Sequence, residues 1–218
     1  MSGELTESER VRRLYDRLAP RYDQLISITE PLLFGGGRAW ACGQARGDVL
    51  EVAVGTGRDL PFYPAGVRLT AVDVSENMLA HARRRASDLD LSVDLRVGDA
   101  QRLDFADASF DTVVATLSLC SIPDHHTAVA EMARVLRPGG QLRLLDHVGS
   151  PNPVVNLVQR LLDPLAVRFG GDHLLRRPDL AVRAAGLDIE RLDSSKLGIV
   201  LGLAARKPCL NSPVTQND

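Results

Sequence analysis

The stretch "LEVAVGTGRDL", residues 50–60, decides the fold. A run of strand-forming residues stops there in a turn that contains Gly55 and Gly57. In an open α/β sheet, ligands bind beyond the carboxyl ends of the strands, and glycine lets the backbone approach them closely. Asp73 ends the next strand-like run, where its carboxylate can accept two hydrogen bonds from a ribose diol. The sequence therefore predicts a binding site for an adenosine-like ligand.

Two other nucleotide sites fit this turn less well. The Rossmann dinucleotide fingerprint, G-x-G-x-x-G, counted from Gly55, needs a third glycine where Leu60 stands. A P-loop needs a Lys-Ser or Lys-Thr pair, and none follows the turn. A second interpretation of Asp73 stays open, in which it only caps the helix that follows.

Strand-like and helix-like segments alternate along the chain after residue 47. We expect strands at 48–54, 67–74, 91–99, 110–119 and 141–148, helices at 76–89 and 126–136, then a helix near 178–185 and strands near 187–194 and 197–206. A Pro-Gly turn is expected to end the helix at 126–136. This alternation predicts an α/β fold with a Rossmann-like, seven-stranded, mostly parallel sheet that helices cover on both faces.

Residues 1–46 are expected to form an N-terminal helical lid on this sheet. Thr6 and Glu9 have the spacing of a capping box at the start of a helix. A second helical stretch, "RYDQLISITEPLLF" at 21–34, is expected to break near Pro31. The lid therefore consists of short helices joined by breaks.

The remaining organisation is one core with an insert. The core is expected to span 47–207, and a helical insert at 153–176 precedes its last two strands. Residues 208–218, "PCLNSPVTQND" from residue 208, are polar and are expected to be a flexible tail. The chain of 218 residues is long enough for one such domain with a substantial core.

Composition and charge exclude several classes of function. The net charge of −2 provides no basic field for nucleic acid. Three widely spaced cysteines, Cys42, Cys120 and Cys209, fit reduced thiols rather than a disulfide framework. No apolar run reaches the length of a membrane span, and the polar N-terminus does not resemble a secretory signal. We therefore expect a cytoplasmic protein, a monomer or homodimer, with at most peripheral membrane contact.

Five segments follow one another in the order and spacing of a known family. They are "LEVAVGTG", "AVDVSENML", "VGDAQRLDF", "FDTVVATLSLCSI" and "EMARVLRPGG". In this the chain resembles the class I S-adenosylmethionine (AdoMet) methyltransferases of the ubiquinone/menaquinone methyltransferase-like superfamily. The sequence departs from the pattern at Ala53, where many members have glycine. The extra methyl group is expected to tighten the pocket slightly without abolishing binding.

The resemblance implies a set of residues that bind AdoMet and its product, S-adenosylhomocysteine. It places a first group at the methionine part, a second at the ribose and adenine, a third at the end of the fourth strand and two tyrosines over the cofactor. In that order they are Glu51, Ala53, Gly55 and Gly57; Asp73, Ser75, Met78, Asp99 and Ala100; Thr116 and Leu117; and Tyr15 and Tyr22. Alternatives stay open, because Asp99 can be only a turn residue and Met78 only a core residue.

The candidate general base is His147, at the carboxyl end of the fifth strand. Histidine titrates near neutral pH, as a general base should. Asp146 precedes it and Tyr22 joins them as a catalytic candidate, although neighbours on a strand point to opposite faces, so that Asp146 and His147 need not pair. An alternative, that His147 only packs, has equal weight. Asp172 and His173 form a second candidate pair.

No metal site is expected, and Cys120 is expected to be a small buried core residue. The neighbouring histidines His125 and His126 have no third ligand near them in the sequence. Cys120 follows directly after a core strand, where a free cysteine packs as a small apolar side chain.

The insert is expected to form a helix with a broad apolar face. That face consists of Val154, Leu157, Val158, Leu161, Leu162 and Leu165. Pro164 is expected to kink the helix or to end its first part. We expect the face to wall an acceptor pocket with Tyr22, Ile26 and Ile28, which makes Ile26, Leu161 and His173 candidate substrate residues. Packing on the sheet is an alternative, and contact with a bilayer is a third, with few cations in support.

The acceptor is expected to be a small, partly apolar molecule. The stretch "VVATLSLCSIPD" and the segments after it look similar to small thiol S-methyltransferases, which favours S-methylation of a thiol or dithiol, such as that of a natural product. Bacterial phosphatidylethanolamine N-methyltransferases and quinone C-methyltransferases share much of the same pattern and remain alternatives. A further alternative is a protein that binds AdoMet without transferring its methyl group.

Overall fold

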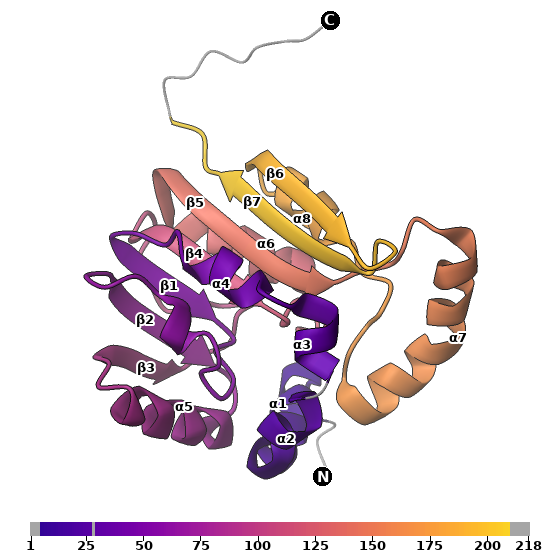
Figure 1. Ribbon diagram of the computed structural model, residues 1–218. Helices are drawn as coiled ribbons and strands as arrows, with labels where there is room; N and C mark the ends of the chain where they lie inside the picture. Colours follow the sequence, from indigo (N-terminus) through magenta and orange to yellow (C-terminus); the bar gives the residue numbers. More distant parts are fainter. Residues whose placement is uncertain (1–4, 28, 210–218) are drawn as a thin grey trace, which may run out of the picture.

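The structure, a computed structural model, describes residues 5–27 and 29–209 (Figure 1). A seven-stranded sheet in the order β3-β2-β1-β4-β5-β7-β6 forms its centre. The strands are β1 (Asp48–Val52), β2 (Arg68–Asp73), β3 (Val93–Val97), β4 (Phe110–Thr116), β5 (Leu136–His147), β6 (Asp188–Ser195) and β7 (Val200–Arg206). The first five are parallel, and β7 runs antiparallel to both β5 and β6. The expected Rossmann-like α/β fold is confirmed.

Helices cover both faces of the sheet and give two apolar cores. Side chains that alternate along the buried strands point to opposite faces, so Val49 packs on one face and Leu50 on the other. The first face is covered by α4 (Gly37–Cys42) and α5 (Glu76–Asp88), and the second by α6 (His125–Val135) and α8 (Pro178–Ala184). The carboxyl ends of the parallel strands are left open at one edge.

The N-terminal helices lie at this open edge (Figure 1). They are α1 (Glu7–Leu18), η1 (Ala19–Arg21), α2 (Tyr22–Ile26) and α3 (Thr29–Phe34). The capping box of Thr6 and Glu9 is present as expected. The helical stretch breaks between α2 and α3 rather than at Pro31, because proline is tolerated in the first turn of a helix, where its missing N–H has no partner to lose.

Two other boundaries differ from the prediction. The Pro-Gly segment after α6 does not form a separate turn but lies within β5, where the pairing with β4 is irregular between Phe110 and Thr112. The insert helix α7 (Pro153–Gly170) continues through Pro164. No residue of α7 is buried, so water can reach the backbone carbonyl that proline leaves without an N–H partner.

No helix within residues 5–27 and 29–209 is long and apolar enough to cross a membrane. Ile28, expected to line the acceptor pocket, lies outside the described residues.

Candidate active site

A narrow cleft lies beside the carboxyl end of β1, where the strand order of the sheet reverses. It consists of two adjoining voids of about 40 and 60 Å³, which share Ala53, Asp73 and the lid residue Val11 on their walls. Pockets that hold a small molecule usually measure about 300–1,000 Å³. The lid helices α1 and α2 therefore lie closed over this cleft.

Asp73 lies at the centre of the cleft, at the end of β2. One carboxylate oxygen accepts the backbone N–H of Gly55 at 2.8 Å and the other that of Ser75 at 2.8 Å. Burial raises the pKa of Asp73 from 3.8 to about 6, against the effect of these N–H groups. Each carboxylate oxygen has a second lone pair, so the group can still accept the two hydroxyls of a ribose. The following helix is capped by Ser75 rather than Asp73.

The two glycines of the opening turn have different roles. Gly55 has a φ of +56° and no atom lies within 4 Å of the position a Cβ would take, so it leaves open space at the cleft. At Gly57 a Cβ would approach Leu60 at 2.9 Å and Ala82 at 3.2 Å. Gly57 therefore serves the close packing of the turn on α5, and it is not among the residues that line the cleft.

Ala53 occupies a position that favours glycine. Its φ is +59°, in the left-handed region that L-residues with a side chain rarely adopt. Ala53 lies on the wall of both voids. The residue therefore carries backbone strain at the cleft, and the narrowing of the pocket by its methyl group stays a prediction.

The far end of the cleft is lined by Asp99 and Ala100, after β3. One oxygen of Asp99 accepts the backbone N–H of Gln101 at 2.9 Å, which holds the carboxylate in place. Met78 and Leu117 line the second void. Ser118, which the sequence did not single out, lines it too, and its buried hydroxyl has no partner among the described residues. An orphaned buried hydroxyl on the wall of the cleft fits a polar ligand such as AdoMet.

Besides Gly57, three residues expected to contact the cofactor do not line the cleft. The Glu51 carboxyl is fully buried, and this burial together with the nearby Asp59 raises its pKa. Thr116 donates its hydroxyl hydrogen to Asp59 at 2.7 Å. Ser75 donates its hydroxyl to Asp16 of α1 at 2.6 Å. Ser75 and Thr116 are thus held by residues distant in the sequence, and the contact of all three residues with the cofactor stays a prediction.

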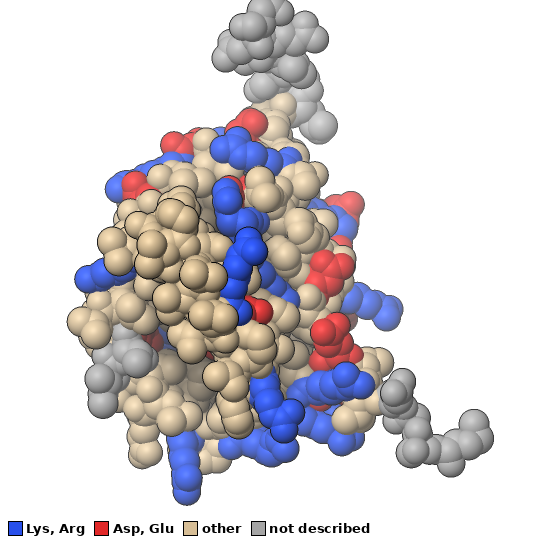
Figure 2. All heavy atoms as spheres, turned by 90° about the vertical axis from the view of Figure 1, so that its right-hand side faces the viewer, with Lys and Arg blue, Asp and Glu red and all other residues tan. Residues whose placement is uncertain are grey.

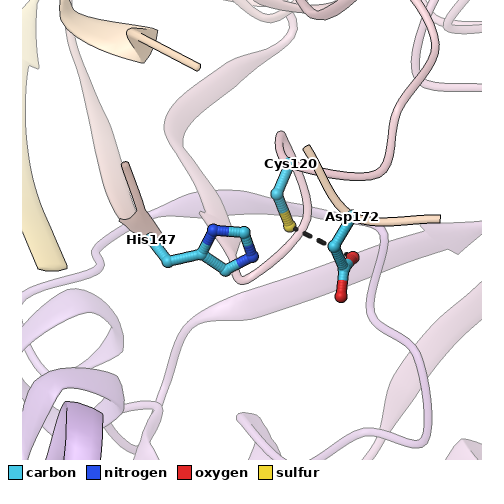
Figure 3. A group of neighbouring side chains, drawn as sticks. All are labelled: Cys120, His147 and Asp172. Atoms are coloured by element: carbon cyan, nitrogen blue, oxygen red, sulfur yellow. Dashed lines mark hydrogen bonds between the residues drawn. The ribbon is translucent and has the colours of Figure 1, made fainter. Parts of the chain in front are cut away.

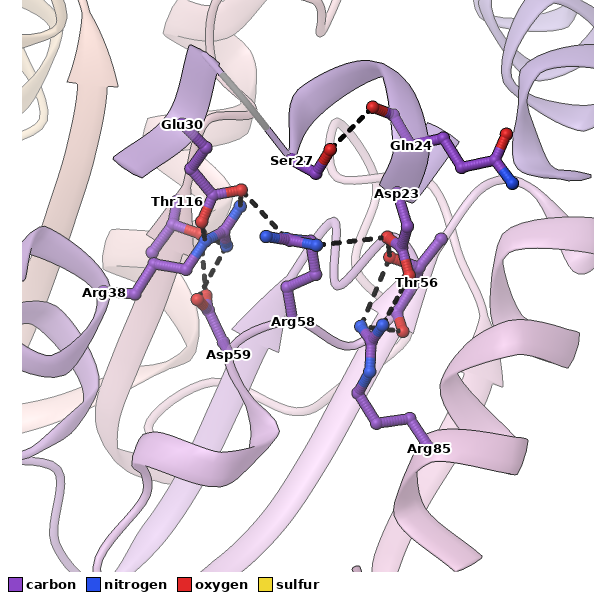
Figure 4. Close-up of polar contacts among 10 residues, drawn as sticks. All are labelled: Asp23, Gln24, Ser27, Glu30, Arg38, Thr56, Arg58, Asp59, Arg85 and Thr116. Atoms are coloured by element: carbon purple, nitrogen blue, oxygen red, sulfur yellow. Dashed lines mark hydrogen bonds and ion pairs between the residues drawn. The ribbon is translucent and has the colours of Figure 1, made fainter. Parts of the chain in front are cut away.

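These partners belong to a polar network that joins the lid to the core (Figure 4). At its centre Arg38 donates to Glu30, Asp59 and Thr116, at 2.5, 2.7 and 2.8 Å. Burial works against the charge of Arg38, but Asp59 and Glu30 raise its pKa above the usual value.

The same network reaches the glycine turn. Asp23 of α2 accepts the hydroxyl of Thr56, between the two glycines, at 2.6 Å, and it also pairs with Arg85 of α5. Arg58 bridges Asp23 and Glu30. The lid is therefore attached to the turn that forms the cleft.

A larger, largely apolar cavity of about 600 Å³ adjoins the cleft. The two spaces share a wall of Tyr15, Tyr22 and Leu117. The rest of the cavity is lined from α1 to α3, by the ends of β4 and β5, and by α7 and the loop after it: Leu18, Leu25, Ile26, Leu33, Phe34, Cys120, His147, Val155, Val158, Gln159, Phe169, Gly170, Asp172, Leu174 and Ile199. An acceptor bound here would be separated from the cleft only by the shared wall.

Three polar side chains meet on the wall of this cavity (Figure 3). Cys120, His147 and Asp172 each offer a polar atom within 4.8 Å of the others. The Cys120 thiol donates to Asp172 at 3.6 Å, and the hydroxyl of Tyr15 donates to the same carboxylate oxygen at 3.4 Å. Nδ1 of His147 is buried without a partner among the described residues. Cys120 is thus part of the site and not only a core residue.

Burial sets the protonation of this cluster. Burial raises the pKa of Asp172, although the neighbouring His147 acts to lower it. Burial, followed by Asp146 and Asp172, raises the pKa of the Cys120 thiol well above its usual value. The thiol is therefore neutral near pH 7 and acts as a hydrogen-bond donor rather than as a nucleophile.

The pairing of Asp146 with His147 is not found. Both oxygens of Asp146 accept backbone N–H groups, one from His147 at 2.8 Å and the other from Ser118 at 3.2 Å and Leu119 at 2.8 Å. Asp146 is buried and fixes the loop after β4. The two side chains do not pair, as their adjacent places on a strand allowed, and Asp172 from the loop after α7 lies beside the histidine instead.

Arg176 explains how that loop is held. Its guanidinium donates to the carbonyl oxygens of Leu119, Ile122 and Pro123, in the loop after β4. The backbone N–H of His173 donates to the carbonyl of Cys120 at 2.9 Å. These bonds hold Asp172 against Cys120. No short motif in the sequence could have indicated them, because more than 50 residues separate the partners.

The three expected substrate residues have different outcomes. Ile26 lines the cavity. His173 does not line it, although its neighbours Asp172 and Leu174 do. Leu161 points away from the cavity and is 71% exposed. The helix α7 contributes Val155, Val158, Gln159 and Phe169 to the cavity wall, so most of the expected apolar face lies on the other side of the helix.

Within the described part of the chain, Cys120, His147 and Asp172 form the one group with the spacing of metal ligands. Cysteine, histidine and aspartate side chains are all ligands that Zn²⁺ binds in proteins. Asp172 already accepts hydrogens from Tyr15 and Cys120, which is the arrangement of a hydrogen-bonded acid–base group. The expectation that the protein holds no metal stays a prediction.

Comparison with known proteins agrees with this geometry. Residues 50–144 match a family described as a methyltransferase domain. The chain is 34% identical over 179 residues to a demethylmenaquinone methyltransferase of Listeria monocytogenes, covering 75% of each chain. It is 42% identical over 118 residues to a phosphatidylethanolamine N-methyltransferase of Cereibacter sphaeroides, covering 53% of this chain and 58% of that one. The chain thus spans little more than half the length of the latter relative.

Solved structures show the same fold. A methyltransferase bound to the Trm112 activator of Haloferax volcanii aligns with a TM-score of 0.71 and 19% identity, over 89% of this chain and 97% of that one. A [4+2]-cyclase aligns with a TM-score of 0.70 and 19% identity, over 94% and 97%. At this identity the likeness concerns the fold alone.

Proposed function

Since the chain belongs to the class I AdoMet-dependent methyltransferases, we propose that it methylates the sulfur atom of a small, largely apolar thiol. One observation carries this proposal. The apolar cavity of about 600 Å³ meets the cofactor cleft at Tyr15, Tyr22 and Leu117. The polar cluster of His147 and Asp172 lies at the same place on an otherwise apolar wall.

The chain's contribution to the reaction is position and exclusion of water. AdoMet supplies an electrophilic methyl group on a sulfonium whose departure leaves a neutral thioether. Tyr15, Tyr22 and Leu117 line both spaces and would hold an acceptor beside the cleft, and the lid helices over the cleft would keep water out. Fixing two reactants in this way can lower a barrier by about 7–11 kcal/mol.

His147 is the proposed base. It lines the cavity, so its imidazole can take a proton from an acceptor bound there. A thiol with a pKa of about 8.5 needs only modest help near pH 7. The imidazole of His147 would take and hold the thiol proton, which leaves the acceptor as a thiolate, and the carboxylate of Asp172 beside it would stabilise the imidazolium. Tyr22 is proposed to position the acceptor.

The cavity suits a thiol better than a phospholipid headgroup. A headgroup phosphate calls for Arg or Lys, and the lining residues that the structure describes include neither. Phosphatidylethanolamine N-methylation nevertheless remains the alternative that the Cereibacter sphaeroides relative supports.

A second candidate is C-methylation of a quinol. The demethylmenaquinone methyltransferase relative covers 75% of both chains, and an apolar ring fits the lining. His147 would then take a proton from a ring hydroxyl, the neighbouring carbon would accept the methyl group, and the hydrogen on that carbon would leave as a proton when the ring regains its aromaticity. The third candidate is a protein that binds AdoMet without transferring its methyl group. It differs from the two methyltransferase candidates because it forms no product.

The test is formation of S-adenosylhomocysteine from AdoMet with matched acceptors. Purified protein is incubated with an apolar thiol, its methyl thioether, a dithiol, a demethylated naphthoquinol and a short-chain phosphatidylethanolamine. We expect product with the thiol or dithiol, a mass increase of one CH₂, and none with the thioether. Product only with the quinol or the phospholipid would replace the thiol proposal by that alternative, and no product with any acceptor would favour the binding protein.

A further inference from the structure

The outer face of α7 is apolar and uncovered. Leu157, Leu161 and Leu165 follow one another at helical spacing and are 59, 71 and 54% exposed. Val154 and Phe169 extend the same apolar surface toward the two ends of the helix, with 70 and 69% exposure. In Figure 1 this helix, in orange, stands apart from the sheet. Apolar surface of this extent on a protein usually marks a contact.

Polar side chains attach α7 to the rest of the protein. Gln159 donates to the carbonyls of Val148 and Leu174, and Asp163 accepts the backbone N–H of Leu174. The helix is therefore oriented with its polar side inward and its apolar side outward. This orientation is opposite to that of an amphipathic helix that packs on a core.

The apolar surface continues on the lid. Leu25 of α2 and Leu32 of α3 are 58 and 70% exposed. Leu25 and Phe169 also line the acceptor cavity, so the exposed surface reaches the entrance of that cavity from both sides. We call this surface, formed by Leu25, Leu32, Val154, Leu157, Leu161, Leu165 and Phe169, the apolar rim.

The charges beside the apolar rim are mostly positive. Arg160 and Arg168 on α7, and Arg17 and Arg21 on the lid, are exposed and take part in none of the salt bridges of the described residues. The acidic residue of α7, Asp163, is occupied by the backbone of Leu174. Figure 2 shows this side of the molecule, with a broad tan area bordered mainly by blue side chains.

We propose that the apolar rim docks on the surface of a bilayer that contains anionic phospholipids. In this arrangement α7 lies in the plane of the interface, its leucines enter the apolar boundary and its arginines meet the phosphates. The entrance of the cavity then faces the lipid, so an apolar acceptor can enter without crossing water. A second copy of the chain is a poorer occupant, because a twofold contact through this rim would bring the unpaired arginines of both copies together.

Binding to vesicles tests the proposal. The full chain is sedimented with phosphatidylcholine vesicles that contain or lack 30% phosphatidylglycerol, at low and physiological salt. We expect binding to the anionic vesicles that weakens with salt. The double variant Leu161→Asp/Leu165→Asp should bind at least tenfold more weakly, since each leucine that leaves the interface costs about a tenfold change. Arg160→Glu/Arg168→Glu should lose the preference for anionic vesicles.

Two controls keep the result interpretable. Leu180→Asp changes a 52% exposed leucine on α8, outside the apolar rim, and should bind as the unchanged protein does. Leu161→Trp should show a blue-shifted fluorescence with vesicles and Leu180→Trp should not, against the constant signal of the one native tryptophan. Circular dichroism checks that each variant is folded, and α7 contains no buried residue whose loss would unfold it.

The outcomes separate this proposal from the choice of acceptor, because vesicle binding needs neither AdoMet nor acceptor. Equal binding of Leu161→Asp/Leu165→Asp and Leu180→Asp would overturn the proposal. So would a dimer in sedimentation velocity that Leu161→Asp/Leu165→Asp dissociates, because the rim would then be covered by a second copy.

Discussion

Asp16 of the lid accepts a 2.6 Å hydrogen bond from the hydroxyl of Ser75, two residues after Asp73. Asp16 also contacts the backbone N–H of Asn77 at 3.4 Å. The first helix is thus attached to the strand end that carries the central carboxylate of the cleft.

Loosening that attachment should change the rates of cofactor binding. In Asp16→Ala, the loss of a hydrogen bond to a charged group is expected to speed dissociation of S-adenosylhomocysteine about tenfold. Association should also become faster, because the voids of the closed cleft are small. Stopped-flow fluorescence measures both rates. Glu7→Ala, an exposed change on the same helix, should leave them unchanged, and equal rates in the two variants would contradict the role of Asp16.

Affinity for AdoMet should fall in acid because of Asp73. Its pKa is about 6 in the folded protein, and the ionised form is the better acceptor for ribose hydroxyls. If only that form binds, affinity drops about tenfold between pH 7.5 and pH 5. Calorimetry measures the AdoMet affinity of both proteins at each pH. Asp73→Asn has no carboxylate at this position, so any pH dependence of its affinity comes from other groups. A parallel drop in both proteins would exclude Asp73 as the cause.

The contribution of Asp73 to the free energy of unfolding changes with pH in the direction opposite to its effect on AdoMet affinity. Because its pKa is raised in the folded state, the contribution of Asp73 to stability is fully present below about pH 4. It is lost as the pH rises through 6. Thermal unfolding of the AdoMet-free protein should therefore show Asp73→Asn gaining relative to the unchanged chain from pH 4 to pH 7.5.

Glycine at position 53 should relieve strain. Ala53 has a φ of +59°, so Ala53→Gly is expected to stabilise the fold by up to about 1 kcal/mol, or a Tm rise of about 2–4 °C for a chain of this size. Ala108, exposed and with a φ of +53°, provides the matched control. Ala108→Gly should raise Tm similarly, while AdoMet affinity changes only in Ala53→Gly. A lower Tm in both variants would show that the entropy of glycine outweighs the strain.

Removing the proposed base should slow turnover. His147→Ala is expected to lower kcat about 10²–10⁴-fold at pH 7, with a smaller loss at higher pH, where the acceptor ionises without help. Asp172→Asn should give a smaller loss in the same direction. His126→Ala, an exposed histidine off the cavity, is the control. A loss below tenfold that does not vary with pH would mean that His147 only packs.

Two changes on α7 should separate the cavity wall from the outer face. Val155 lines the cavity, whereas Leu161 does not. In an assay without vesicles, Val155→Asp should raise KM for an apolar acceptor at least tenfold, and Leu161→Asp should leave KM unchanged. AdoMet affinity should be unaffected in both. Equal effects on KM would show that α7 changes its orientation when the acceptor binds.

Much of the fold could be predicted because the pattern is local. Helix α5 was expected at 76–89 and is observed at Glu76–Asp88, since its cap and its apolar spacing are both written in adjacent residues. Strand β4 was expected to continue to 119 but ends at Thr116. Leu117 takes a φ of +50° there, and a left-handed leucine gives no signal in composition or periodicity.

The site could be predicted only in part, because its partners are distant in the sequence. Asp73 could be predicted because it ends a strand, and the topology of the sheet places the ends of the parallel strands at the cleft. The sequence could not show that the hydroxyl of Thr116 is held by Arg38 and Asp59, because these partners are supplied by other segments. The helical spacing of the apolar residues in α7 was predicted correctly, but most of them face outward and not toward the cavity. The inward side of the helix is set by hydrogen bonds of Gln159 and Asp163 to loop residues.

The buried contacts of Arg38 have a consequence for exchanging parts between related enzymes. Arg38 of α4 and Glu30 of α3 precede β1 in the chain, whereas Asp59 and Thr116 follow it. The Asp59 carboxylate is only 1% exposed. In a chimera that takes its N-terminal segment from a relative without this arginine, that carboxylate would be buried without its cation. We therefore expect a chimera joined at the start of β1 to be more stable when positions 38, 59 and 116 come from the same parent.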